Sequence, residues 1–250
     1  MADPPTAPLS PMETLLVVQE HDTAADRLRH RRATLAERAE LQAAEAALAE
    51  NRVAHTTLAA TRAEIDGNER RLGDEVATVA GKATDVEKSM YSGAISSPRE
   101  LQAMQADVEQ LRKQQGLLED REIELMEARE QLDTEMGDLD TVAAASTAEI
   151  ERLQRVIAEE EAAIDAELAA ELSARTAAAA ALPGEVVATY EKIRAANGTG
   201  AARLVGMSCQ ACHLTIPSTE VDHMRRAAHA GDVTGAMNFC DNCGAILVLT

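Results

Sequence analysis

The stretch SGAISSPRE, residues 92–100, contains the signal that decides the fold of this 250-residue chain. In it, Ser97 is followed directly by Pro98, and Glu100 lies three residues after the serine. This pattern is typical of a helix start, because the serine hydroxyl and the glutamate carboxylate each accept from a backbone N–H that the first turn leaves unpaired. Pro98 also disfavours helical backbone at the preceding residue. The stretch therefore predicts a connection between two helices, the second beginning near residue 98.

The same signal occurs at Ser10, Pro11 and Glu13, which predicts that an earlier long helix begins near residue 11. Along both helices, apolar residues recur every seven positions, which is the spacing of a coiled-coil seam. The first set is Leu58, Ile65, Leu72, Val79 and Val86, and the second is Met104, Leu111, Leu118, Leu125 and Leu132.

The two sets fit an antiparallel hairpin. If Leu58 faces Leu132 and the pairing continues inward, the numbers of each pair sum to 190, which places the midpoint at residue 95. In this register the basic stretch RLRHRR (27–32) meets the acidic stretch EEEAAID (159–165). The alternative is a parallel dimer of one continuous helix, which the second helix start disfavours.

These patterns divide the chain into three parts. We expect a disordered N-terminus over residues 1–10, an antiparallel coiled-coil hairpin over 11–182 with its tip near 90–97, and a zinc-ribbon domain over 183–250. The predicted fold class is mostly α: a long antiparallel coiled-coil helical hairpin followed by a small α+β zinc-ribbon domain. Three glycines either bend the first arm or are simply tolerated in it: Gly67, Gly73 and Gly81.

The terminal part is predicted to combine short helices and strands. After Pro183, the sequence EVVATYEKIRAANGTG has the apolar spacing of a short helix, and Asn197-Gly198 is typical of a helix end. AARLVGM (201–207) and GAILVL (244–249) are predicted strands, and STEVDHMRRAAHAG (218–231) is a predicted helix.

All four cysteines of the chain lie in this part, as two Cys-x-x-Cys pairs: Cys209 with Cys212, and Cys240 with Cys243. Two such pairs can complete a tetrahedral site for one structural Zn²⁺, and Gly244 suits the tight backbone of the second pair. A redox pair, two disulfides or an iron site are the alternatives. A redox pair would need a βαβ setting, and disulfides are disfavoured in a reducing compartment.

Three histidines lie between the pairs: His213, His223 and His229. We interpret them as surface side chains, the alternative being that one replaces a cysteine ligand. Four cysteines would close the site, and a closed site has no position for a metal-bound water. The sequence also shows no phosphate-binding loop and no nucleophile elbow, so we predict that the protein is not an enzyme.

Composition narrows the functional classes further. The formal net charge is −19, and aromatic residues make up only 1% of the chain, which argues against a wide enzyme core and against nucleic-acid binding by general charge attraction. The N-terminus lacks the pattern of a signal peptide, and no stretch has the length of a membrane span. We therefore expect a cytoplasmic protein with no membrane partner.

The sequences MYSGAISSPRELQAMQADVEQL (90–111) and CQAC with CDNCGAIL resemble the bacterial C4-type zinc-ribbon family with a long coiled-coil hairpin, which includes FlgZ-like proteins. The resemblance implies a non-catalytic adaptor, since some members are linked to transcription factors or secretion machinery. Only the four cysteines carry over as functional residues. Ala245 stands where relatives often carry Arg, which weakens the case for anion contact there.

The predicted function is a cytoplasmic adaptor or scaffold that uses the hairpin and the zinc ribbon to bind a protein partner, possible settings being transcription and secretion. We expect this partner at the ribbon surface or at the hairpin tip around Tyr91, Ile95 and Arg99. The alternative is a nucleic-acid-binding zinc ribbon acting in transcription, with Arg225 and Arg226 contacting phosphate.

Overall fold

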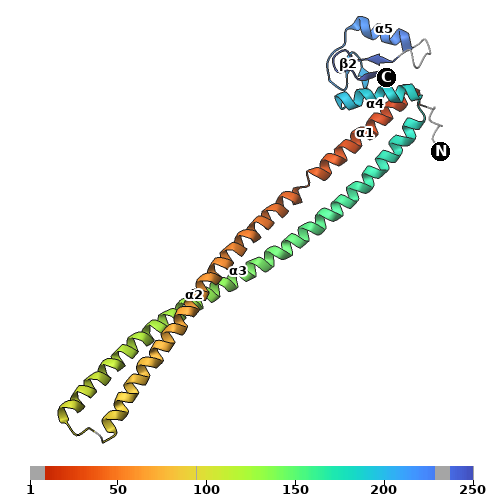
Figure 1. The fold of residues 1–250 in the computed structure, drawn as a ribbon. Helices are drawn as coiled ribbons and strands as arrows, with labels where there is room; N and C mark the ends of the chain where they lie inside the picture. The colour runs from red at the N-terminus through yellow and green to blue at the C-terminus, as the bar shows by residue number, and fades with distance from the viewer. Residues whose placement is uncertain (1–8, 94, 229–236, 250) are drawn as a thin grey trace, which may run out of the picture. The chain divides into compact units, whose positions relative to one another are not determined.

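The computed structural model describes residues 9–93, 95–228 and 237–249. These residues form long helices followed by a small region of strands (Figure 1). The predicted fold class is therefore confirmed. The helices are α1 (Pro11–Ala33), α2 (Ala36–Tyr91), α3 (Pro98–Ala180), α4 (Gly184–Asn197) and α5 (Ser218–Ala228), and the strands are β1 (Ala201–Val205), β2 (Ser208–Cys209), β3 (Asn238–Phe239) and β4 (Ile246–Leu249).

Both predicted helix starts are where helices begin. At the start of α1, the Glu13 backbone N–H donates to the Ser10 hydroxyl oxygen at 3.2 Å, and the Ser10 N–H donates to the Glu13 carboxylate at 2.8 Å. At the start of α3, the Leu101 N–H donates to the Ser97 carbonyl at 3.1 Å. The alternative of one continuous helix is wrong, because α2 ends at Tyr91 and α3 begins at Pro98. The expected N-terminal disorder falls almost wholly on residues outside the described part.

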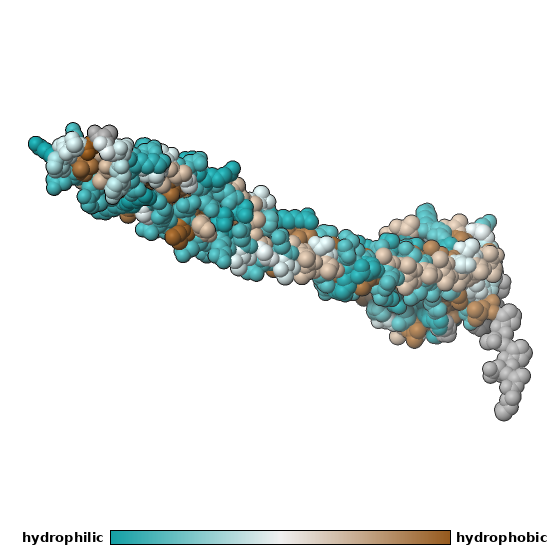
Figure 2. All heavy atoms as spheres, turned by 90° about the horizontal axis from the view of Figure 1, so that it is seen from below, coloured by the Kyte–Doolittle hydropathy of each residue, from teal (hydrophilic) through white to brown (hydrophobic). Residues whose placement is uncertain are grey.

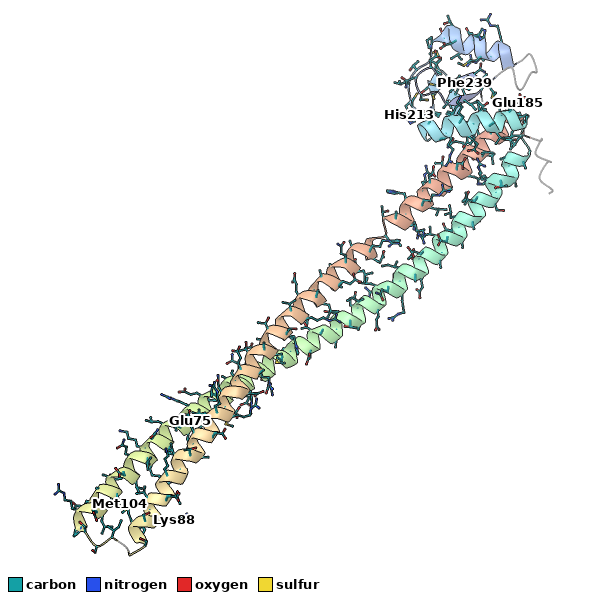
Figure 3. The ribbon with its side chains drawn as sticks, viewed as in Figure 1. Glu75, Lys88, Met104, Glu185, His213 and Phe239 are labelled. Carbon is teal, nitrogen blue, oxygen red and sulfur yellow. The ribbon has the colours of Figure 1, made fainter. Side chains whose placement is uncertain are left out.

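The chain divides into two compact units, one made of Met1–Ala36 with Val156–Thr250 and the other of Glu37–Arg155. In the second unit, α2 and the first part of α3 run antiparallel, and Lys88 and Met104 lie on opposite arms near their connection (Figure 3). All ten predicted seam residues are at least partly shielded from solvent, and two of them, Val79 and Leu118, are buried.

Ion pairs join the two arms of this unit beside the seam. Arg129 lies 2.8 Å from Glu69, and Arg112 lies 3.1 Å from Glu87. Both pairs remain accessible to solvent, and ion pairs of this kind add little stability, about 0–1 kcal/mol each. Their value is in specifying which positions face one another, since a shifted register would bring like charges together.

The first arm departs from the prediction of one long helix. It is interrupted between Ala33 and Ala36, where Thr34 ends α1 by donating its hydroxyl to the His30 carbonyl at 2.8 Å. The sequence held a signal for this: Thr34 and Glu37 have the Thr-x-x-Glu spacing typical of a helix start. By contrast, α2 continues through the three glycines considered as possible bends.

The other unit builds its core from α1, the end of α3, α4 and the strands. Buried apolar side chains of α1 pack against Val186 and Tyr190, which are the centre of the face predicted for α4. The predicted charge match is partly confirmed here, because Arg31 pairs with Glu160 at 2.9 Å. Within α1 itself, Arg29 pairs instead with Asp26.

The strands form one sheet in the order β2-β1-β4-β3. β1 is parallel to β4, and the two outer pairings are antiparallel. Side chains alternate across the sheet: Ala201 and Ile246 join the core with α1 and α4, whereas Ala202 and Leu247 join a second core that includes α5 residues and all four cysteines. The sheet thus lies between the base of the hairpin and the cysteines.

One close contact in this unit gives a first prediction. A Cβ added to Gly200 would lie 2.5 Å from two ring carbons of the fully buried Tyr190. We expect Gly200→Ala to lower the free energy of unfolding by about 1–3 kcal/mol, because a fully buried ring would have to shift to make room for the methyl group. Urea unfolding followed by tyrosine fluorescence measures this in a Tyr91→Phe background, where Tyr190 is the chain's single tyrosine.

Gly184 provides the matched control for this substitution. A Cβ added there would meet no atom within 4 Å, and Gly184 is the first residue of α4. Gly184→Ala should therefore leave stability unchanged or raise it slightly. Equal stability of the Gly200→Ala and Gly184→Ala proteins would show that the Tyr190 contact is not tight.

Among the described residues, no helix combines the length and the apolar character that crossing a bilayer requires.

Candidate metal centre

The structure brings the four cysteine side chains together. Their Sγ atoms all lie within 4.8 Å of one another; Cys209 is 3.8 Å from Cys243, and Cys212 is 3.8 Å from Cys240. A disulfide would require about 2.05 Å, so the four are free thiols in this arrangement. Four sulfurs bonded tetrahedrally at about 2.3 Å would be separated by about 3.8 Å. The donor set and its spacing therefore fit a zinc-sized ion.

The first pair is held in a tight turn after β2. The His213 N–H donates to the Cys209 carbonyl at 2.8 Å, and the Cys209 N–H donates to the Leu214 carbonyl at 3.1 Å. His213 has a φ of 59°, in the left-handed region that residues other than glycine seldom adopt. Sequence reasoning missed this feature, because histidine adopts such a backbone only occasionally and so does not mark it in a sequence.

The second pair repeats this turn after β3. The Gly244 N–H donates to the Cys240 carbonyl at 2.7 Å, and the Cys240 N–H donates to the Ala245 carbonyl at 2.9 Å. Gly244 has a φ of 71°, so the tight backbone predicted at this position is present. The two turns have equivalent hydrogen bonds although their sequences share little beyond the cysteines.

The thiols differ in their electrostatic surroundings. Burial raises the pKa of Cys209, and burial also raises the pKa of Cys243, to about 12. The backbone N–H of Leu214 lowers the pKa of Cys212 to about 7, and the Asn242 side chain acts in the same direction. Near neutral pH, Cys212 thus has substantial thiolate character while Cys209 and Cys243 remain protonated. A metal that takes all four sulfurs must therefore displace protons.

The histidines between the two pairs do not join the cysteines. His213 and His223 are exposed, and neither contributes to the described cysteine cluster. His213 directly follows Cys212 in the chain and is labelled in Figure 3. His229 lies outside the described residues. The 27 residues that separate the two pairs include α5, as the sequence predicted.

A second polar site, on α1, was missed entirely by sequence reasoning. Asp22 is only 3% exposed, and its Oδ2 accepts from the Tyr190 hydroxyl at 2.7 Å. The Nε atoms of Arg175 and Arg194 each lie 3.4 Å from an Asp22 carboxylate oxygen. Burial, followed by the hydrogen bond to Asp22, raises the pKa of Tyr190. The phenol therefore stays protonated and donates.

Gln19 completes this buried polar cluster, which we define as Gln19, Asp22, Arg175, Tyr190 and Arg194. Its Oε1 accepts from the backbone N–H groups of Gly200 at 2.8 Å and Ala201 at 3.2 Å, and lies 3.2 Å from the Tyr190 hydroxyl oxygen. The cluster thus joins α1, α3 and α4 to the beginning of β1. A signal was available, because Asp22 interrupts the apolar stripe Leu15, Val18 and Ala25 at helical spacing.

Comparison with known proteins places the chain in a family. Residues 18–198 match the CT398-like coiled coil hairpin domain. The chain belongs to this family. The family model describes a coiled-coil hairpin, so the coiled-coil part of the sequence resemblance is confirmed.

Relatives match over nearly the whole chain. An uncharacterized protein of Mycobacterium tuberculosis is 30% identical over 245 residues, which cover 97% of this chain and 96% of that protein. A solved structure from Mycobacterium smegmatis is 25% identical with a TM-score of 0.81, covering 98% and 99% of the two chains. CT398 of Chlamydia trachomatis is 16% identical with a TM-score of 0.69, covering 96% and 98%, and shares the fold.

Proposed function

We propose that this CT398-like protein is a non-catalytic adaptor of the cytoplasm that holds one structural zinc ion and binds a protein partner. The observation that carries the proposal is the cluster of four thiols at tetrahedral spacing, with 3.8 Å between the Sγ atoms of Cys209 and Cys243 and between those of Cys212 and Cys240. Cys209, Cys212, Cys240 and Cys243 would hold the ion. With four protein ligands, such a site is closed to water and has a structural role.

The zinc ion would join the two halves of the terminal sheet. β2 and β3 lie at opposite edges of the sheet, and each leads into one of the cysteine turns. The chain offers few large side chains with which to hold these edges together by packing alone, since it has no Trp and one Phe. A metal ion supplies the missing stability in small domains of this kind.

The hairpin tip supports the partner-binding part of the proposal. Tyr91 is 86% exposed at the end of α2, and Arg99 is exposed in the first turn of α3. Ile95 is half-buried, which fits a role in closing the turn. On the face drawn in Figure 2, hydrophilic residues predominate and hydrophobic ones are scattered. Tyrosine and arginine are enriched among the residues that contribute most to binding at protein interfaces.

We expect a protein with both Tyr91→Ala and Arg99→Ala to lose most of its partner in a pull-down from the native lysate. Tyrosine and arginine anchors each contribute about 2 kcal/mol or more where they are buried by a partner, which is roughly a 30-fold loss of affinity. The readout is the amount of each co-purified protein, with helical content checked by circular dichroism. The matched control is Val53→Ser, a change of a 68% exposed apolar residue elsewhere on α2.

Unchanged recovery with the double variant would remove the tip from the proposal. The nucleic-acid alternative is tested with random single-stranded and double-stranded oligonucleotides at about 150 mM salt, where we expect no binding because few phosphates can be neutralised. Binding in the micromolar range that weakens with salt and disappears on changing Arg225 and Arg226 would replace the adaptor by a nucleic-acid-binding ribbon.

A further inference from the structure

We propose that Asn197 and Gln19 couple the metal centre to α1, so that zinc binding strengthens the attachment of β1 to the base of the hairpin. The inference rests on the proposed zinc site. It concerns two side chains that do not ligate the metal: Asn197, which contacts a cysteine turn, and Gln19, which contacts the start of β1.

The first contact is between α4 and the second cysteine turn. Asn197 is the last residue of α4, and its Nδ2 donates to the Cys243 carbonyl at 3.0 Å. A Cβ added to Gly244 would lie 3.2 Å from the same Nδ2, so the amide packs directly against the turn. Cys243 is one of the four ligands, so Asn197 helps to fix where its backbone lies. Residues of this kind tune metal affinity by holding ligands in place.

The backbone continues from Asn197 to β1 with little freedom. Gly198 has a φ of 79°, and its N–H donates to the Arg194 carbonyl at 2.8 Å, which ends α4. Two residues later the Gly200 carbonyl accepts from the Ile246 N–H at 2.9 Å. Ile246 begins β4 only two residues after Gly244. The second cysteine turn therefore reaches Gly200 by two routes, one through α4 and one through β4.

Both routes end at Gly200, which is hydrogen-bonded to Gln19 of α1. Its Oε1 accepts from the N–H groups of Gly200 and Ala201 in a buried position, and Gln19 is itself only 9% exposed. If the strand moved away, two backbone donors and the amide would lose their partners. Each buried group left without a partner costs about 1–3 kcal/mol. Loss of this contact is therefore costly, and it would follow from any movement of Gly200 and Ala201 away from α1.

Hydrogen bonds and short segments of backbone thus form a continuous path from Cys243 to Gln19. Without zinc, the second turn loses what holds it to the first, and the positions of Asn197 and Ile246 are less restricted. We infer that the Gly200 and Ala201 contacts with Gln19 then open more often. Because coupling between two equilibria is reciprocal, a variant that cannot form the Gln19 contacts should bind zinc more weakly.

The test measures zinc affinity by competition with a chromogenic chelator, using Zn²⁺ as the probe. We expect Gln19→Ala to bind zinc about 5–150-fold more weakly than the unmodified protein, the usual range for coupled sites. The matched control is Glu20→Ala, which removes an exposed ion pair between the same helix and Arg203 of β1. The control should stay within about twofold. An affinity for Gln19→Ala as high as that of the control would overturn the coupling.

A second variant tests the contact beside the metal centre, where Asn197 donates to the Cys243 carbonyl. Asn197→Ala should lower zinc affinity about 10–100-fold. In the zinc-loaded protein it should also accelerate hydrogen exchange at the amides of Gly200 and Ala201, with Lys192→Ala on the exposed side of α4 as control. Lys192 is exposed, so Lys192→Ala leaves both hydrophobic cores intact. If exchange at these two amides is unchanged, the coupling is wrong even where Gln19→Ala fails to fold.

The two proposals fail in distinguishable ways. An unmodified protein that binds no zinc would overturn the proposed metal site and the coupling with it. An unmodified protein that binds one zinc ion, with unchanged affinity in Gln19→Ala and Asn197→Ala, would leave the metal site standing and remove the coupling alone.

Discussion

Removing zinc is expected to unfold the terminal sheet while leaving most of the helical signal of the protein in place. The sheet strands are short, two to five residues each, and two of them lead directly into the cysteine turns. The long helices α2 and α3 pack along their own seam, which involves no cysteine. The protein should therefore lose its β region and α5 and keep the hairpin.

The size of this effect follows from the donor set. Structural zinc in small modules contributes about 10–16 kcal/mol, which exceeds the total stability of most domains of this size. Cys243→Ser and Cys212→Ser should each abolish stoichiometric zinc, since a hydroxyl is a poor replacement for a thiolate. His223→Ala is the matched control: this α5 histidine is exposed, so the variant should keep one zinc ion per chain.

The pH dependence of zinc binding follows from the thiol pKa values. Cys209 and Cys243, with raised pKa values, release protons only when the metal binds, and Cys212, with a pKa of about 7, also becomes protonated as the pH falls below that value. Zinc affinity should therefore fall as pH is lowered from 8 to 6, because more protons must be displaced.

Elemental analysis of the purified protein gives the metal and its stoichiometry, and hydrogen exchange at the β4 amides reports on the sheet before and after chelation. One zinc ion per chain with chelator-induced exchange at β4 is the expected outcome. Iron in place of zinc, or a sheet that stays protected in the metal-free protein, would contradict it.

The parts of the fold that the sequence predicted are those specified by local patterns. Ser10 and Ser97 mark helix starts by interactions within one turn, and the seven-residue seam depends only on periodicity. The metal site was also predictable from the sequence, since two Cys-x-x-Cys pairs are typical of a structural zinc site. That the four cysteines lie close together was inferred from their shared role as metal ligands, and not from a prediction of the strand order.

The features that were missed depend on tertiary contacts or on weak local signals. Asp22 on α1 resembles one more exposed acid in a chain that has 43 acidic residues, and only the folded position of Arg175 and Arg194 makes it a buried partner. His213 adopts a left-handed backbone because the turn around Cys209 and Cys212 requires it. The Thr34 and Glu37 spacing indicated the break between α1 and α2. The helical pattern on both sides of it nevertheless led to the prediction of one long helix.

Replacing Asp22 by alanine is expected to destabilise the unit at the base of the hairpin by about 3–5 kcal/mol, because breaking a buried ion pair leaves uncompensated charge. The Asp22 side chain is 5% exposed, and those of Arg175 and Arg194 are about one-fifth exposed. The Tyr190 hydroxyl would also lose the carboxylate to which it donates at 2.7 Å. Both arginines keep a second, more exposed partner, Glu191 and Asp26 respectively, which should place the loss at the lower end of the range.

Two further variants separate charge from hydrogen bonding. Asp22→Asn keeps an acceptor for the Tyr190 hydroxyl but removes the charge, so its loss should be smaller than that of Asp22→Ala. Asp26→Ala removes the other carboxylate that contacts Arg194, from the same helix, but at a side chain that is 51% exposed, so about 1 kcal/mol or less is expected. Urea unfolding of the zinc-loaded proteins, followed by Tyr190 fluorescence in the Tyr91→Phe background, gives the three values. If Asp22→Ala is no less stable than Asp26→Ala, the buried carboxylate does not hold the hairpin base together, and the packing of Leu15, Val18 and Val186 must do so instead.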